Sequence, residues 1–253
     1  MGEYMPNPRD EAELITNALF TDFGTGGYVD GPVPHVDGHI AIQEMKDDGF
    51  PGWQDVEWAG YHIKYLIQQA CDEYLPGQFT PYVQGRRHLI RGDHLWDSRF
   101  NANEEEIVIL GDVQEYNDLI RLNRGIGILV VDAQANSDLT GDFIQWHDDL
   151  KGGISTYTVE RELEGRPPRR RKTEYMIRKI RAYFFNIGDF ETGVHDGWLN
   201  DTFQQSMRNA NADPRNPKYK FKISDVPERY LVFVKNFNED SREFAEEYPA
   251  FAN

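Results

Sequence analysis

The chain has almost none of the residues that would support a covalent or thiolate-based framework. Its 253 residues contain one cysteine, Cys71, which excludes an intrachain disulfide and a cysteine-based zinc cluster. Cys71 lies in the stretch "LIQQACDEYL", and we expect a packed thiol there because cysteine commonly behaves as a small buried hydrophobe. The serine-nucleophile spacing Gly-x-Ser-x-Gly is absent as well.

Long apolar runs and excess positive charge are also missing. No apolar run approaches membrane-spanning length, and the first residues, "MGEYMPNPRDEAELI", lack the basic start and apolar stretch of a secretion signal. We therefore expect a cytoplasmic protein that does not bind membranes. The net charge of −16 argues against a general nucleic-acid coat protein. Positive charge must therefore be examined locally.

What is present predicts one globular unit of mixed α/β (α+β) class. With 39% hydrophobic residues, the chain can bury a sizeable core, so residues 1–253 are expected to form a single domain. Apolar periodicity and turn residues predict a mixed central sheet flanked by helices. The expected helices are 10–20, 54–75, 116–124, 169–185 and 240–248, and the expected strands are 88–100, 105–116, 125–135, 218–225 and 229–237.

Two aspartates flank the polar segment "NANEEE", and a hairpin folded there would bring Asp97 and Asp112 opposite each other. Cross-strand neighbours have Cβ atoms roughly 4.5–5.5 Å apart, which is close enough to share a divalent cation. Along the second strand, Asp112 and Gln114 would share one face. Such an oxygen-rich site suits Mg²⁺, with Mn²⁺ as a substitute. A metal held there could activate water for phosphodiester hydrolysis.

These residues resemble the active-site pattern of the PD-(D/E)xK nucleases, the fold of most type II restriction endonucleases. The resemblance covers about residues 54–135, where helix, hairpin, helix and strand follow the family's core order. It implies that Asp97 and Asp112 are catalytic metal ligands. Gln114 stands where the family usually has lysine, and it would orient the attacking water or the phosphate. Trp96 stands where the family usually has proline.

The resemblance implies a Mg²⁺-dependent, sequence-specific endonuclease of double-stranded DNA with a restriction-endonuclease-like core. Cleavage would leave a 5′-phosphate and a 3′-hydroxyl. Enzymes of this class commonly form homodimers, because a palindromic site carries twofold symmetry. A cognate DNA methyltransferase is a further partner that the class implies.

Other assignments of the acids stay open. Asp132-Ala133-Gln134 also follows an apolar strand and could supply the second motif, with Asp112 as its upstream acid. An upstream helical acid, Glu57 or Glu73, could join the site. Aspartates at strand ends can instead be purely structural, because their side chains accept hydrogen bonds from nearby backbone amides.

DNA recognition is expected from about residues 160–235. Residues 161–181, "RELEGRPPRRRKTEYMIRKIR", contain nine basic and three acidic residues, and lysine and arginine neutralise phosphates while arginine also contacts guanine edges. We expect a loop that delivers Arg169, Arg170, Arg171 and Lys172 to a following helix. Smaller basic groups could contact backbone phosphates, namely Arg86 and Arg87 in "QGRRH" and the lysines of "NPKYKFK".

Two functions of other classes remain as alternatives. A non-catalytic DNA-binding or DNA-mimic protein would use the acidity to imitate a phosphate backbone, and it would need no divalent metal. A metal hydrolase acting on a small molecule would use "HVDGH", in which His35, Asp37 and His39 would share one face of a strand. The Gly-x-Gly of "GIGILVVDA" precedes its strand, whereas a dinucleotide site needs the glycines after the strand.

Overall fold

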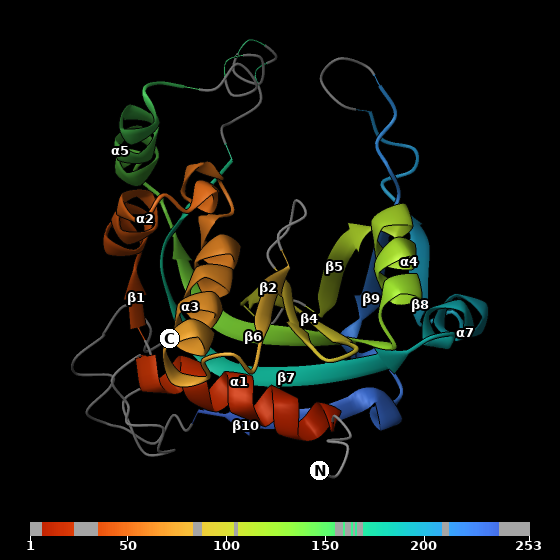
Figure 1. Ribbon diagram of the computed structural model, residues 1–253. Coiled ribbons are helices and arrows are strands. Elements are labelled where there is room, and N and C mark those ends of the chain that lie inside the picture. Colours follow the sequence, from red (N-terminus) through yellow and green to blue (C-terminus); the bar gives the residue numbers. More distant parts are fainter. Residues whose placement is uncertain are drawn as a thin grey trace.

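The computed structural model describes residues 7–22, 35–82, 88–103, 106–154, 159, 163, 165, 169–208 and 213–237. In this part of the chain, helices surround two β-sheets (Figure 1). The larger sheet has the order β1-β7-β6-β4-β3-β2, with β10 also paired to β7, and the smaller sheet has the order β5-β9-β8. The larger sheet contains both parallel and antiparallel pairs, which confirms the expected mixed α/β class.

The helices, including three short 3-10 helices (η), are α1 Pro8–Asp22, α2 Gly38–Asp47, η1 Pro51–Gln54, α3 Trp58–Tyr74, α4 Val113–Leu122, α5 Asp142–Lys151, α7 Asp189–Asp196, η2 Ile223–Asp225 and η3 Glu228–Tyr230. The strands are β1 His35–Asp37, β2 Thr80–Tyr82, β3 His88–Arg91, β4 His94–Ala102, β5 Ile107–Asp112, β6 Gly125–Ser137, β7 Lys172–Asn186, β8 Leu199–Phe203, β9 Lys218–Lys222 and β10 Leu231–Asn236. No helix in the described ranges has the length and apolar character needed to cross a membrane.

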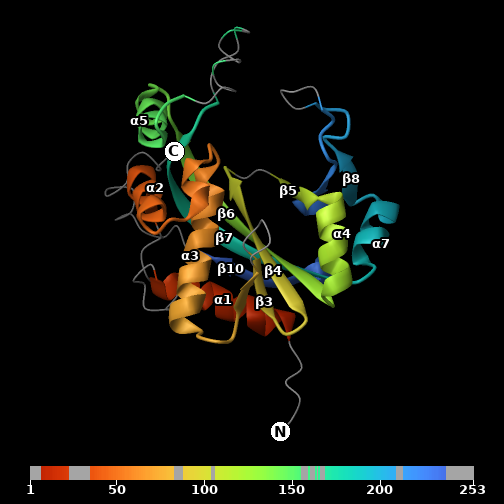
Figure 2. The same cartoon turned by 45° about the horizontal axis from the view of Figure 1, so that its top comes forward.

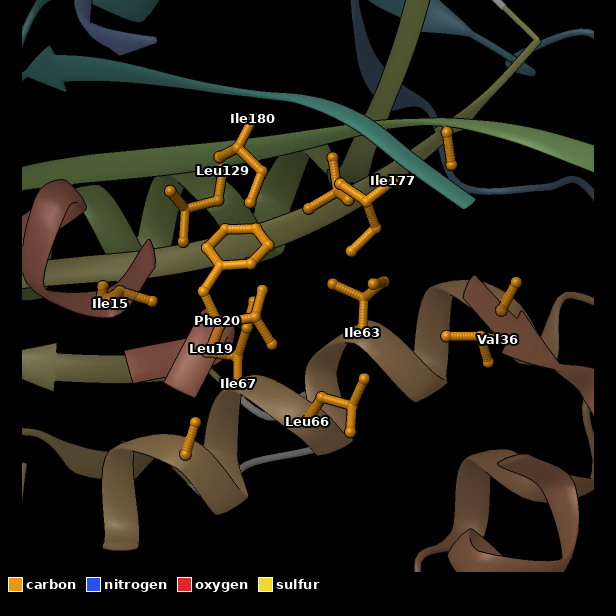
Figure 3. Packing of buried hydrophobic residues seen from close by; sticks show 14 of the residues in the cluster. Ile15, Leu19, Phe20, Val36, Ile63, Leu66, Ile67, Leu129, Ile177 and Ile180 are labelled. Atoms are coloured by element: carbon orange, nitrogen blue, oxygen red, sulfur yellow. The ribbon is translucent and has the colours of Figure 1, made fainter. Parts of the chain in front are cut away.

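The larger sheet is covered on both faces, and this explains the continuous apolar run of β6. On one face, α1 and α3 pack their aliphatic residues against β6 and β7 (Figure 3). On the other face, the smaller sheet and α4 enclose a second cluster. This second cluster includes Leu95, Val108, Leu110, Tyr116, Ile126, Ile128, Tyr183, Phe185 and Phe221. The two clusters fix the strands on which the site residues lie.

The strand within the parallel connection between β4 and β6 leaves the larger sheet. β4 pairs in parallel with β6, from His94 opposite Gly125 to Ala102 opposite Ala133. Between them in sequence, β5 pairs with β9 in the smaller sheet, and α4 follows directly. The smaller sheet and α4 therefore lie toward one end of the curved larger sheet, whereas α3 lies toward its other end (Figures 1 and 2).

Several expected elements are confirmed, including α1, α3, β6, β9 and β10. The expected hairpin between Asp97 and Asp112 is wrong, because β4 and β5 belong to different sheets. The hairpin of this region lies upstream, where β3 and β4 pair across a turn at Gly92, whose φ is 58°. The expected last helix at 240–248 lies outside the described residues.

Two local assignments are also wrong. Residues 113–116 begin α4 instead of continuing a strand, so Gln114 is helical. Residues 172–186 form strand β7 instead of a helix. Its apolar residues Met176, Ile177, Ile180, Tyr183 and Phe184 recur at helical spacing, but they are buried because β7 has core on both of its faces.

Candidate functional site in a groove between the two sheets

A groove of about 1260 Å³ separates α3 and η1 from β5, and the second half of β4 forms part of its lining. Among the described residues, five cationic side chains line it, against two acidic ones. The cations come from distant parts of the chain and are Lys64, Arg99, Arg169, Lys172 and Lys218, whereas the acids are Asp55 and Glu57. In a chain of net charge −16, this is a local concentration of positive charge, which favours an anionic ligand.

Behind the groove lies a buried carboxylate, Asp97, whose side chain is 0% exposed. Its Oδ1 lies 2.5 Å from Nζ of Lys64 and 3.2 Å from Nδ1 of His88. Its Oδ2 accepts a hydrogen bond of 2.5 Å from the hydroxyl of Tyr116 and pairs with Arg99. Arg99 also donates to the Tyr116 hydroxyl, at 2.9 Å. Both carboxylate oxygens therefore have cationic or hydroxyl partners.

The fold brings these five residues together from four elements. Strand alternation places Asp97 on the same side of β4 as Leu95 and Arg99, and Leu95 belongs to the core beneath the smaller sheet. Tyr116 reaches Asp97 from α4 and is itself fully buried. The parallel β4–β6 connection thus places the start of α4 over the middle of β4.

The charge state of Asp97 follows from its surroundings. Burial raises the pKa of its carboxyl group, but the charges of Arg99, Lys64 and His88 outweigh burial and hold that pKa well below the usual value. The pKa of Tyr116 is raised, first by burial and also by the neighbouring carboxylate, so its phenol stays protonated and donates. Asp97 is therefore an ionised group that holds Lys64 and Arg99 in fixed positions beside the groove.

The expected metal ligands have separate environments. Asp112 precedes the first residue of α4, and its Oδ2 accepts a hydrogen bond of 3.3 Å from Asn216. Gln114 lies in the first turn of α4 and donates to Asp118 at 3.0 Å. Over the described residues, no group of three or more histidine, cysteine or acidic side chains is placed to hold a metal ion. This geometry does not fit a Mg²⁺ or Mn²⁺ ion shared by Asp97 and Asp112.

The expected DNA-contacting residues divide into four groups. Arg169 and Lys172 line the groove, where Lys172 lies 3.1 Å from Glu57 and over the ring of Phe100. Arg170 is exposed. Arg171 instead points into the protein, where it pairs with Asp148 at 2.6 Å and donates to the carbonyl of Ile144. Arg86 and Arg87 lie outside the described residues.

The remaining candidate acids also have defined positions. Asp132 on β6 accepts a 2.6 Å hydrogen bond from Asn101 and pairs with Arg181. Gln134, which belongs to the same Asp132-Ala133-Gln134 segment, accepts a hydrogen bond from Arg178. Glu57 contacts Lys172, as above, and Glu73 is exposed near the end of α3.

The "HVDGH" residues do not share a strand face, because β1 ends at Asp37 and His39 already belongs to α2. His35 lies 2.9 Å from Glu174. Asp37 caps α2 by accepting from the backbone of His39 and Ile40. His39 packs against the ring of Trp146. Each of the three residues thus has its own partners.

Sequence reasoning missed Lys64, His88, Arg99 and Tyr116. Lys64 left no signal in the sequence, because it lies beside the helical pattern of Ile63, Leu66, Ile67 and Ala70 and does not break it. Tyr116 had none, since only the tertiary path of α4 places its hydroxyl on Asp97. No protein-family model, curated protein or solved structure matches the chain.

Proposed function

We propose that this protein is an endonuclease of double-stranded DNA and that the duplex lies in the groove. One observation carries this proposal: a strongly acidic chain gathers Lys64, Arg99, Arg169, Lys172 and Lys218 around one concave surface. DNA presents one negative charge per 1.7 Å of helix axis. A groove lined by cations from several elements suits such a ligand better than a small neutral molecule.

The order of the elements supports a nuclease. α3, the β3–β4 hairpin, α4 and β6 keep the helix, hairpin, helix and strand order that the resemblance implied, with β2 inserted before the hairpin and β5 inserted between the hairpin and α4. The hairpin differs from the expected one, so the acid of the second hairpin strand is Asp97 and the basic residue two positions on is Arg99.

Lys64 and Arg99 would act on the scissile phosphate. In phosphodiester hydrolysis, negative charge develops on the phosphoryl oxygens, and fixed cations in a partly desolvated site stabilise that charge. Asp97 is a positioning residue in this proposal, because it orients both cations and does not itself touch the substrate. A dependence on Mg²⁺, a homodimer and a cognate methyltransferase stay predictions from the resemblance.

A non-catalytic DNA-binding protein is the second candidate. It is favoured by the partners of Asp97, which occupy both carboxylate oxygens, and by the lack of a metal-binding group in the described residues. This protein would bind the same duplex in the same groove and leave it intact.

One experiment separates the two candidates. Purified protein is incubated with plasmid and phage DNA, with Mg²⁺ or with EDTA, beside Arg99→Ala, an Arg169→Ala/Lys172→Ala double variant, and the control Lys235→Ala on β10. An endonuclease produces discrete fragments that are lost with Arg99→Ala. A binding protein gives a mobility shift, with no cleavage, that is lost with the double variant alone. If neither DNA is cut or shifted in any metal or salt, the groove does not bind duplex DNA and both candidates are wrong.

A further inference from the structure

The smaller sheet has an outer face that no described element covers with apolar residues. Its inner face carries Val108, Leu110, Tyr219 and Phe221, all buried in the second core. The outer face carries two isoleucines of β5, Ile107 and Ile109, which are 49% and 39% exposed. β5 is also an edge strand of its sheet. An exposed apolar edge strand is a surface that soluble proteins normally protect, so a partner is expected there.

A row of lysines lies beside the isoleucines. In the β5–β9 register, Ile107 is opposite Lys222 and Ile109 is opposite Lys220, so all four side chains point to the same side of the sheet. Lys218 follows two residues earlier on β9, at the same alternation. Neighbouring strands lie about 4.8 Å apart and alternate residues about 6.8 Å apart. The outer face therefore carries an apolar row and a parallel cationic row.

The contacts of Lys220 and Lys222 are weak. Nζ of Lys220 lies over the ring of Phe203, at 4.9 Å from its centroid. Lys222 pairs with Glu106 at 3.0 Å and approaches Asp225 at 4.0 Å, and both acids are more than half exposed. Ion pairs between exposed side chains contribute little to stability, so a phosphate group can displace the two acids from Lys222.

The other end of the row belongs to the groove. Lys218 is opposite Asp112 across β5 and β9, and it lines the groove together with Ile107 and Ile109. The lysine row therefore begins at the groove and continues along β9. A ligand in the groove can follow it without a break.

Only a few ligands match parallel apolar and cationic rows. In a nucleic-acid strand, the bases form an apolar row with phosphates alongside, and unpaired bases expose their faces to apolar side chains. In a duplex those faces are stacked on one another. We propose that the outer face of the β5-β9-β8 sheet binds a single strand of DNA, with bases on Ile107 and Ile109 and phosphates along Lys218, Lys220 and Lys222. This inference rests on the proposed function, because Ile107, Ile109 and Lys218 line the groove of the proposed duplex, so the strand would be one that separates from that duplex at β5 and continues along β9.

The test uses the full chain and a fluorescent 15-nucleotide oligothymidine, whose binding is followed by anisotropy over a series of salt concentrations. Lys220→Gln removes one phosphate contact, so we expect weaker binding and a slope of log K against log salt that is lower by about 0.7. Ile107→Ser/Ile109→Ser is expected to weaken binding with the slope unchanged, because that contact involves no counterion. The matched controls, Lys235→Gln at a half-buried position and Ile187→Ser at an exposed one, alter residues outside this sheet and should leave both quantities unchanged.

Parallel assays separate the possible failures. One outcome overturns this inference and leaves the proposed function intact. In that outcome, duplex binding requires Arg169 and Lys172, but the β5 and β9 variants bind oligothymidine as the wild type does. Absence of duplex binding overturns the proposed function itself. If Ile107→Ser/Ile109→Ser changes the sedimentation of the free protein from dimer to monomer, the face binds a second copy and the inference is also wrong. Circular dichroism checks that each variant is folded.

Discussion

At the scale of single residues, the main finding is that Asp97 has a different environment from the one its sequence context suggested. Reasoning from the sequence selected Asp97 as important, and it lies beside the groove with four charged or hydroxyl-bearing side chains in contact. It could not find Lys64, His88 or Tyr116, because their convergence depends on how α3, β3 and α4 pack. A short motif identifies a candidate residue, whereas the role of that residue depends on which side chains the fold places around it.

Replacing Asp97 should therefore affect stability strongly and in a pH-dependent way. Asp97→Asn leaves Lys64 and Arg99 buried without their counter-charge, so we expect a loss of about 3–5 kcal/mol in the free energy of unfolding at pH 7. The folded pKa of Asp97 is lowered, so its contribution is present above the unfolded value, about 3.9, and is lost as the pH falls below it. Urea unfolding at pH 7 and pH 3 should show the gap between wild type and variant narrowing in acid.

Asp93→Asn is the matched control for that experiment. Asp93 lies in the β3–β4 turn and pairs with Arg124, and both side chains are more than half exposed. Its replacement should change the free energy of unfolding by less than about 1 kcal/mol. Equal losses in the two variants would show that the Asp97 cluster contributes no more than a surface ion pair.

His62 should make the free energy of unfolding depend on pH in a range closer to neutrality. Burial lowers the pKa of His62 from 6.5 to about 3, and the neutral ring contacts the hydroxyl of Tyr175 at 2.8 Å. Unfolding exposes the ring, which then binds a proton below pH 6.5. The stability contributed by neutral His62 is therefore complete above 6.5 and is lost as the pH falls toward 3.

For wild type, this amounts to about 2 kcal/mol between pH 7 and pH 5. His62→Gln keeps a polar side chain but does not titrate, so its loss over the same interval should be smaller by that amount. Paired urea unfolding curves at the two pH values measure the difference. Identical losses in wild type and His62→Gln would mean that His62 binds its proton over the same pH range in the folded and unfolded states, so that burial does not lower its pKa.

At the scale of elements, the length of an apolar run predicted the secondary structure better than the spacing of its apolar residues. The uninterrupted run of β6 predicted a buried strand, and the structure confirms it because the sheet has core on both faces. The same two-sided burial misled the assignment of β7, whose apolar residues need not alternate. The departure of β5 to the smaller sheet could not be predicted, since its partner β9 lies about a hundred residues downstream.

The glycines of "GIGILVV" illustrate a packing requirement within β6. A Cβ added at Gly127 would meet the ring of Trp96 at 2.1 Å, so Gly127→Ala must displace a fully buried indole. We expect a loss of about 1–3 kcal/mol in the free energy of unfolding, measured by urea titration.

Gly60 provides the comparison. It lies inside α3, and a Cβ there would make an ordinary contact of 3.6 Å with Phe100. Gly60→Ala should therefore raise the free energy of unfolding by about 0.5–1 kcal/mol, because alanine favours the helix. If both substitutions have the same sign, close ring packing is not what selects glycine in β6.

At the scale of the whole molecule, the cations of the 169–172 stretch serve different purposes. Arg169 and Lys172 line the groove, whereas Arg171 joins the chain before β7 to α5 through Asp148 and the carbonyl of Ile144. The sequence marked this stretch as basic, but it could not separate the two roles because burial is set by the position of α5.

This division predicts that substitutions only two residues apart have different effects, one on stability and the other on DNA binding. Arg171→Ala removes the more deeply buried of the two cations that pair with Asp148, the other being Lys151, and should lower the free energy of unfolding by about 3 kcal/mol. Arg169→Ala should leave stability within about 0.5 kcal/mol and weaken duplex binding, with a lower salt slope. Thermal unfolding and a binding titration on each variant measure both effects. Stability losses of equal size would contradict the assignment of Arg171 to the interior.

The pairing of β5 with β9 has a consequence for synthesis of the chain. β5 is complete once residue 112 has emerged, but its hydrogen-bonding partner begins at residue 218. Contacts of such sequence separation form late, because a long loop must close first. Until then, the uncharged segment "IVILG" has neither edge paired, which is the condition under which strands of different chains associate. The acidic residues at 104–106 directly before it are placed where like-charge repulsion would oppose that association during translation.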